Sequence, residues 1–353
     1  MQPSIYISNI ILSNFRSHEK FTINSNSKNI VLFGKNGVGK TNILESISLL
    51  SPGRGLRNAK NEEIINKNTN TDYGLSANLQ FDNNSIKIKK TYLRDETKKS
   101  NLFIDDEKSK TADLLNFLRV IWVTPVMEKI MLQSNSERRN FFDRLIFNIE
   151  KKHLKAFTAY NKFTKERLHI LKSNAPDSAW LEQIEKKIAV CAYEIIEYRQ
   201  AAISKINTNL SLISLPFNSC IIELNYEDTL KITSDIGEFT FDYENTLFKN
   251  RTIDKETNRT LVGPNKVEVK MWKLDDRSIE AKYCSTGEQK SILISIILSV
   301  AQIIKNSDFA KPPIILIDEA MAHLDQHHRE ALVDELSKLN TCLLYTSDAA
   351  DDL

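Results

Sequence analysis

The sequence has almost no net charge. Its 48 Lys and Arg residues stand against 46 Asp and Glu, a formal charge of +2 over 353 residues. A strongly basic or acidic balance favours or opposes binding of nucleic acid, and this chain has neither. Any interaction with nucleic acid therefore has to be sought in local groups of basic residues.

Cysteine is also scarce. The four cysteines are scattered along the chain, and no two of them form a C-x-x-C pair: Cys191, Cys220, Cys284 and Cys342. This spacing indicates neither a zinc site nor a disulfide framework. It favours buried or incidental thiols in a reducing compartment.

The sequence shows no targeting or membrane-spanning pattern. Residues 1–8 lack the basic start and apolar core of a signal peptide. The longest apolar run, residues 292–304, contains Ser295 and Ser299 and is too short to cross a bilayer. We expect a cytoplasmic protein, and its length is sufficient for two domains.

A glycine loop near the N-terminus carries the clearest chemistry. The segment Gly34-Lys35-Asn36-Gly37-Val38-Gly39-Lys40-Thr41 fits the phosphate-loop pattern G-x-x-x-x-G-K-[ST]. An apolar strand, residues 29–33, precedes it and a helical apolar pattern follows, which favours a phosphate loop over a glycine turn without a ligand. We expect the loop N–H groups to surround the phosphates of ATP, Lys40 to reach the β- and γ-phosphates, and Thr41 to hold Mg²⁺.

An acidic pair far downstream supplies the expected partner of the loop. Asp318 and Glu319 end the apolar run 314–317. A buried strand ending here would aim the Asp318 carboxylate at the Mg²⁺ ion. Glu319 is then placed to polarise the attacking water as the catalytic base. A solvated strand end is the weaker alternative.

A Ser-x-Gly-x-Gln element, Ser285 to Gln289, precedes the acidic pair by 33 residues. Ser285 and Glu288 also fit a helix capping box, and without further context that interpretation would be preferred. The order of motifs favours the signature set of ABC-type ATPases: glycine loop, Ser-x-Gly-x-Gln, apolar-Asp-Glu, then a Leu-Asp pair ending in Asp325. In that class, Ser285, Gly287 and Gln289 would contact ATP held by a second copy, with Asp325 at the interface. The set predicts an ATP-dependent homodimer.

Hydrophobic periodicity predicts an α/β fold. Strands are expected at 5–12 and 29–33, and alternating residues at 75–81 and 86–92 predict a β-hairpin. Apolar residues at helical spacing from about 136 to 202, broken near Pro176, predict two long helices forming an antiparallel arm. Residues 221–270 return to strand-like alternation. We therefore expect an ABC-type head with a mixed sheet, flanking helices and an antiparallel β-subdomain, into which a helical arm is inserted: 1–125 (head), 126–220 (arm) and 221–353 (head).

Basic residues gather on the predicted arm. From 138 to 172 there are ten Lys or Arg residues against three acids, with aromatic residues between them. Such a stripe can neutralise DNA phosphates without reading sequence. A solvated helix face is an equally good interpretation. The candidate DNA contacts are Arg138, Arg139, Lys151, Lys152 and Lys155. Two further basic strips are Lys87, Lys89, Lys90 and Arg94, expected on the outward side of the hairpin, and Arg54 with Arg57.

With these residues in place, the chain closely resembles the RecF family of bacterial DNA replication and repair proteins. The resemblance covers nearly the whole chain and includes 12–16, 36–45, 51–54, 136–144 and Gly263-Pro264. The arginine pair at 138–139 followed by Phe and Asp is distinctive of that family. The resemblance implies a cytoplasmic, weakly DNA-stimulated ATPase that dimerises on ATP and binds duplex DNA near single-strand gaps. It also implies work with RecR and RecO in loading RecA.

Two segments depart from the family pattern. RecF proteins usually have Gly-Pro-His-Arg at the position where this chain has Gly263-Pro264-Asn265-Lys266. Lys266 keeps the positive charge of the arginine. The last dozen residues, from Cys342, are small and acidic towards the end and are interpreted as a truncated or foreign end. Residues 343–345 are a candidate last strand, and no switch residue is assigned.

Two alternative functions are compatible with the motifs of the head when the arm is left aside. A nucleotide-binding subunit of a transporter predicts a membrane partner and no DNA affinity, and the basic arm and the pair Arg138 and Arg139 argue against it. A scaffold that binds ATP but hardly hydrolyses it is the second alternative. Glu319, a competent base, argues mildly against that one.

Overall fold

The computed structural model describes residues 5–69, 71–81, 84–94, 99–213, 216–226, 230–307, 311–319 and 324–347. The chain divides into two compact units. The first, here called the head, comprises Met1–Lys129, Leu212–Ser219 and Ser285–Leu353; the second, the arm, comprises Ile130–Ser211 and Cys220–Cys284. The predicted boundaries differ at both sides of the arm: residues 221–284, assigned to the head from sequence, belong to the arm unit, while 126–129 and 212–219, assigned to the arm, belong to the head unit.

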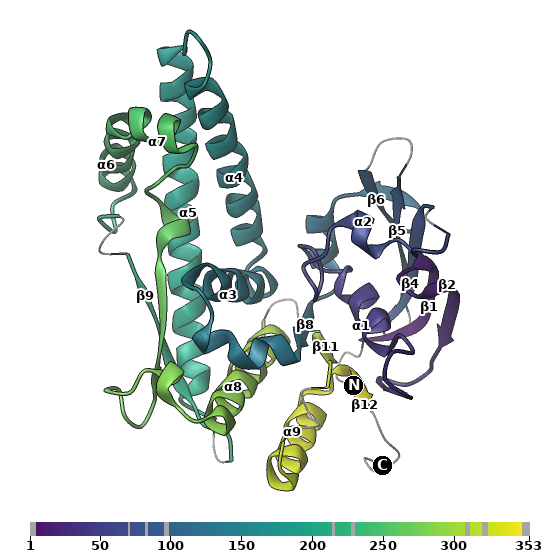
Figure 1. Ribbon diagram of the computed structural model, residues 1–353. Helices are drawn as coiled ribbons and strands as arrows, with labels where there is room; N and C mark the ends of the chain where they lie inside the picture. Colours follow the sequence, from purple (N-terminus) through teal and green to yellow (C-terminus); the bar gives the residue numbers. More distant parts are fainter. Residues whose placement is uncertain are drawn as a thin grey trace. The chain divides into compact units, whose positions relative to one another are not determined.

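The head contains an antiparallel sheet. Its strands are β1 (Ile5–Phe15), β2 (His18–Asn24), β4 (Tyr73–Phe81), β5 (Asn84–Leu93), β6 (Lys99–Ile104) and β7 (Glu107–Ser109), in the order β2-β1-β4-β5-β6-β7. Every second residue of β4 is buried, as the alternation predicted. The predicted first strand and the β4–β5 hairpin are confirmed, and the antiparallel β-subdomain with them (Figure 1).

A parallel sheet joins the two ends of the chain within the head. The strands β3 (Asn29–Phe33), β12 (Cys342–Ser347), β11 (Ile314–Ile317) and β8 (Val120–Val123) lie in the order β3-β12-β11-β8. All residues of β8 and β11 are buried, as expected for parallel strands covered on both faces. The predicted last strand is confirmed, while residues 348–353 lie outside the described part of the chain.

Four helices of the head accompany these sheets: α1 (Lys40–Ser48), α2 (Asn61–Ile64), α8 (Thr286–Lys305) and α9 (Gln326–Leu339). Helix α8 is long and apolar enough to cross a membrane by length and composition alone. However, 72% of its most apolar stretch is buried inside the protein. The hydroxyl of Ser295 donates to the carbonyl of Asn218 at 2.6 Å. These contacts identify α8 as a helix of the head core.

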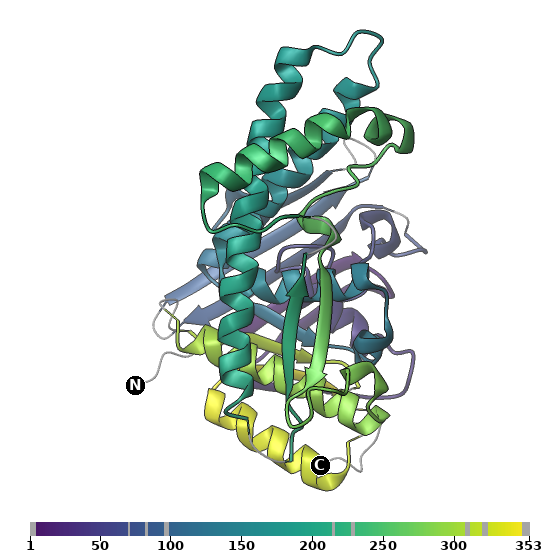
Figure 2. The same cartoon turned by 90° about the vertical axis from the view of Figure 1, so that its left-hand side faces the viewer.

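The arm is built on two long antiparallel helices, as predicted. These are α4 (Lys151–Leu171) and α5 (Ser178–Leu210), which lie side by side in both views (Figures 1 and 2). The expected first helix, however, is divided. Glu150 adopts an extended conformation between α3 (Asn135–Ile149) and α4, and its carboxylate accepts from the N–H of Lys152 at 2.9 Å. Glu150 therefore ends one helix and caps the next.

The strand-like prediction for residues 221–270 is correct only at its ends. Strands β9 (Cys220–Asn225) and β10 (Glu268–Lys273) pair antiparallel, but α6 (Ile236–Lys249) and α7 (Arg251–Thr257) lie between them. Phe239, Tyr243 and Leu247 recur every fourth residue, the spacing of one helix face, and are buried in the core that α4 and α5 share. This helical period was misinterpreted as alternation.

Candidate functional site

The glycine loop takes the conformation that its sequence predicts. It connects β3 to α1, and Gly34, Gly37 and Gly39 have φ angles of 148°, 85° and 101°. Side chains rarely adopt such angles, and a Cβ on Gly39 would come within 2.6 Å of His18 Nε2. The Lys40 ammonium donates to the carbonyl of Gly34 across the loop. Glycine is therefore required for the path of this backbone.

The two ends of the chain meet at Thr41 and Asp318. The Thr41 hydroxyl donates to Asp318 Oδ1 at 2.9 Å, although the residues are 277 positions apart. Asp318 directly follows β11, and its N–H donates to Val123 in the neighbouring strand. Burial raises the pKa of the Asp318 carboxyl, while the hydrogen bond from Thr41 lowers it. The structure thus brings together the two residues predicted to hold Mg²⁺.

Glu319 stands beside Asp318 in an unusual backbone conformation. Its φ is 52°, and its N–H donates to Thr346 Oγ1 at 2.9 Å. The Thr346 hydroxyl also donates to Asp318 Oδ1 at 3.2 Å. The end of β12 therefore fixes both acidic residues, a contact that sequence analysis did not assign. Only the alignment of strands in the parallel sheet brings Thr346 to this place.

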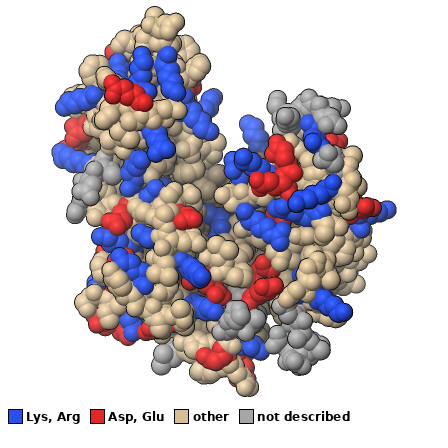
Figure 3. All heavy atoms as spheres, in the orientation of Figure 1, with Lys and Arg blue, Asp and Glu red and all other residues tan. Residues whose placement is uncertain are grey.

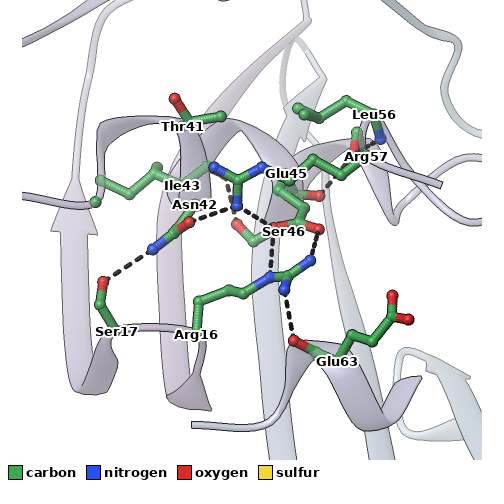
Figure 4. A network of polar contacts seen from close by, with 12 residues as sticks. Arg16, Ser17, Thr41, Asn42, Ile43, Glu45, Ser46, Leu56, Arg57 and Glu63 are labelled. Atoms are coloured by element: carbon green, nitrogen blue, oxygen red, sulfur yellow. Dashed lines mark hydrogen bonds and ion pairs between the residues drawn. The ribbon is translucent and has the colours of Figure 1, made fainter. Parts of the chain in front are cut away.

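A fully buried carboxylate anchors the helix that follows the loop. Glu45 of α1 accepts hydrogen bonds from Arg16 at 2.5 and 2.8 Å and from Arg57 at 2.9 Å (Figure 4). Arg57 also donates to Asn42, which in turn donates to Ser17 at 2.8 Å. The turn after β1 and the segment before α2 are thereby tied to α1. Arg57, a member of a predicted basic strip, pairs with Glu45, and a contact of its partly exposed side chain with DNA stays a prediction.

These residues fit a nucleoside triphosphate with Mg²⁺. Because the glycines with positive φ have no side chains, phosphates can approach the N–H groups of the loop. The Lys40 ammonium lies against the same loop. The hydroxyl of Thr41 and the carboxylate of Asp318 supply the oxygen donors that Mg²⁺ prefers. Lys35, Asn36, Gly37 and Val38 are exposed along the loop.

The Ser-x-Gly-x-Gln element begins α8. Ser285 caps the helix: its hydroxyl accepts from the N–H of Glu288, and its own N–H donates to the Glu288 carboxylate at 2.9 Å. The capping interpretation is therefore confirmed. Ser285 and Gly287 are nonetheless exposed, and a Cβ on Gly287 would meet no atom within 4 Å. Gln289 is buried. Contact with ATP of a second copy stays a prediction.

Asp325 begins α9 as its cap. Its carboxylate accepts from the N–H of His328 at 2.9 Å and lies 2.7 Å from His328 Nδ1. The backbone hydrogen bond lowers the pKa of Asp325. The role of Asp325 at a dimer interface stays a prediction.

The candidate DNA contacts fall into two groups. Arg138 donates to the carbonyls of Val269 and Gln133 at 2.9 and 2.8 Å, and Arg139 donates to that of Val267 at 2.9 Å. Both arginines thus fasten α3 to the segment of β10. Lys151, Lys152 and Lys155 are instead exposed at the start of α4.

One member of the predicted basic stripe lies inside the arm. Arg167 is fully buried, and its guanidinium donates to Glu185 at 2.8 Å and to Asp254 at 2.7 Å. An arginine neutralised by two carboxylates adds nothing to the surface charge. The lysines of the stripe stay outside, and Figure 3 shows basic side chains over the visible face of the arm.

Comparison with known proteins agrees with this geometry. The family profile described as the RecF/RecN/SMC N terminal domain matches residues 6–344. DNA replication and repair protein RecF of Rickettsia prowazekii (strain Madrid E) is 34% identical over 358 aligned residues, covering 99% of this chain and 96% of the relative. The protein of the same name from Rhizobium rhizogenes (strain K84) is 31% identical, with 96% and 91% covered.

A solved structure shows the same fold. The structure of the recombination mediator protein RecF with ATP in the RecFOR pathway matches with a TM-score of 0.87 at 23% identity. The match covers 99% of this chain and 94% of that one. An ABC-type ATPase head with a helical arm is therefore the fold of this chain. The match along the whole length, together with curated relatives above 30% identity, establishes that the chain belongs to the RecF family.

Proposed function

We propose that this chain is an ATP-switched DNA-binding protein of recombinational gap repair. In this proposal it forms a homodimer on ATP, binds duplex DNA next to single-strand gaps, and acts with RecO and RecR in loading RecA in the cytoplasm. Slow hydrolysis of ATP resets it. The observation that carries the proposal is the hydrogen bond between Thr41 and Asp318, which assembles a nucleotide site inside a RecF-family chain.

The head residues have separate roles in this site. The N–H groups of the loop and the Lys40 ammonium hold the phosphates, while Thr41 and Asp318 hold Mg²⁺. Glu319 orients and deprotonates the attacking water. When bound, ATP supplies a γ-phosphate whose presence distinguishes the closed dimer from the open monomer.

The exposed start of the signature element supports the proposed dimer. Ser285 and Gly287 lie at the N-terminal end of α8, where helix N–H groups favour an anion. In an isologous dimer each copy would present this end to ATP held by the other. Asp325 would lie near the same interface. The arrangement makes dimerisation depend on nucleotide.

The Glu319→Gln variant tests the proposed function. It keeps the size of the side chain but removes the base, so we expect ATP to be retained and hydrolysis to fall by at least tenfold. Sedimentation with Mg²⁺-ATP should then show a stable dimer that co-sediments with gapped duplex DNA. A variant that turns over ATP at the original rate, or stays monomeric at all ATP concentrations, would contradict the assignment.

Charge reversal on the arm tests the DNA contact. Changing the exposed lysines to glutamate should weaken binding, because a lysine that neutralises a phosphate releases counterions from the duplex. The slope of log affinity against log salt should fall by about 0.9 for each phosphate that the variant no longer neutralises. The variant carries Lys151→Glu, Lys152→Glu and Lys155→Glu; the charge-matched control carries Lys205→Glu, Lys249→Glu and Lys255→Glu, all exposed elsewhere on the arm. Equal effects in both variants would show that these lysines form a solvated surface and do not contact DNA specifically.

A further inference from the structure

A lysine faces the core of the antiparallel sheet. Along β5 the side chains alternate, and Lys90 falls in phase with the buried Ile88 and Tyr92. Its neighbours across the ladder are Leu75 in β4 and Leu102 in β6. Lys90 is only 8% exposed. The prediction that it lies outward with Lys87 and Lys89 is therefore wrong, because one position along a strand changes the face.

The buried Lys90 ammonium is not neutralised within the described chain. It donates to the carbonyl of Leu49, at the end of α1, at 3.2 Å. No carboxylate among the described residues lies within ion-pair distance of it. Burial accordingly lowers its pKa to about 8. A carbonyl at a helix C-terminus stabilises a cation, but it does not supply the full counter-charge that a buried ammonium requires.

Lys90 lines a cavity with a marked excess of positive charge. The cavity has a volume of about 600 Å³ and lies wholly within the head. Three further cations line it, Arg54, Lys60 and Lys110, each from a different segment. The carboxylate in the wall belongs to Glu62, which already accepts a hydrogen bond from Tyr92 at 2.9 Å. Hydroxyls of Ser109 and Thr111 also line the cavity, although that of Ser109 already donates to the carbonyl of Glu107 at 3.1 Å.

We propose that this cavity binds phosphate groups of a DNA strand. Four cations against one carboxylate exceed the charge of a single phosphodiester, so the lining suits successive phosphates of a polyanion. Guanidinium, ammonium and hydroxyl donors are the groups that bind phosphate oxygens. No residue of the loop 34–41 lines the cavity, so it is distinct from the nucleotide site. The proposal rests on the DNA-binding function proposed above and adds a specific anchor on the head.

DNA affinity of the Lys90→Met variant is the first test. Methionine keeps the apolar stem but removes the charge, and with it the desolvation cost of a buried ammonium that has no carboxylate partner among the described residues. We expect binding of a duplex with a gap to weaken at least fivefold and the salt slope to decrease. The matched control is Lys20→Met, which removes the same charge from an exposed position of β2 in the same sheet, outside every predicted basic strip, and should change affinity less than twofold. Equal affinity in Lys90→Met and the original protein, or equal weakening in both variants, would overturn the proposal while leaving DNA binding itself intact.

Inorganic pyrophosphate provides the second test, in a Lys40→Ala background that disables the nucleotide loop. We expect pyrophosphate to raise the melting temperature of this protein, and the rise to disappear when Lys90→Met is added. Double-stranded DNA should compete with pyrophosphate for the site. Stabilisation without competition would show a site for free phosphate alone and overturn the assignment to DNA. The surface double variant Lys60→Gln with Lys110→Gln repeats the test without changing any buried residue.

Discussion

Replacing Lys40 with alanine is expected to lower the affinity for ATP by more than about 100-fold. A charge-assisted hydrogen bond contributes about 1.5–3 kcal/mol, and the ammonium would make such bonds to two phosphates. Each 1.4 kcal/mol corresponds to a factor of ten in affinity. Because the dimer depends on nucleotide in the proposed function, ATP-dependent dimerisation should disappear as well. Calorimetric titration with Mg²⁺-ATP and sedimentation measure the two effects.

The control for Lys40 lies in the same loop. Lys35 carries the same charge but is exposed, and only its main-chain N–H is expected to face the phosphates. Lys35→Ala should therefore change the affinity for ATP less than threefold. A Lys40→Ala protein that still dimerises on ATP, or an equal drop in affinity in the two variants, would contradict the phosphate-loop assignment.

Local sequence was sufficient to predict the loop, because its determinants are adjacent. An apolar strand, glycines at fixed spacing and a helix fix the backbone path without distant residues. The meeting of Thr41 with Asp318 was also predictable, although from the order of motifs and not from spacing. The carboxyl ends of parallel strands lie at one edge of a sheet, so a loop after β3 and an acid after β11 meet there.

The residues that sequence analysis placed incorrectly depend on non-local partners. Arg167 looks like any other cation of the stripe until the structure brings Glu185 and Asp254 to it. Lys90 is different, since the alternation of Ile86, Ile88 and Tyr92 already puts position 90 on the inner face. Lysine was expected on the outer face because it is charged, although the alternation visible in the sequence places it on the inner face.

A motif residue of the arm illustrates the same point. Asp143 closes the Arg-Arg-Asn-Phe-Phe-Asp segment, and in the structure it is buried. It accepts two hydrogen bonds of 2.8 Å from Arg199, and His153 Nε2 lies 3.0 Å from it. Burial raises the pKa of Asp143, but Arg199 and His153 lower it further, to about 2. Asp143 thus holds α3, α4 and α5 together.

We therefore expect Asp143→Ala to destabilise the protein by about 3–5 kcal/mol, because it leaves the buried Arg199 guanidinium without its counter-charge. Urea unfolding followed by circular dichroism measures the decrease in stability. The double variant Asp143→Ala with Arg199→Met removes both charges, and it should recover much of the stability if the uncompensated charge is the cause.

The dependence on pH separates charge from packing at Asp143. The folded pKa of about 2 lies below the value of about 3.9 for an unfolded aspartate, so the stabilisation is complete above roughly pH 4. It is lost as the pH falls towards 2, because over this range the unfolded chain takes up a proton at Asp143 while the folded protein does not. The difference in unfolding free energy between the original protein and Asp143→Ala should shrink over this window. A difference that stays constant from pH 6 to pH 2, or a double variant as unstable as the single one, would assign the effect to poorer packing around the shortened side chain.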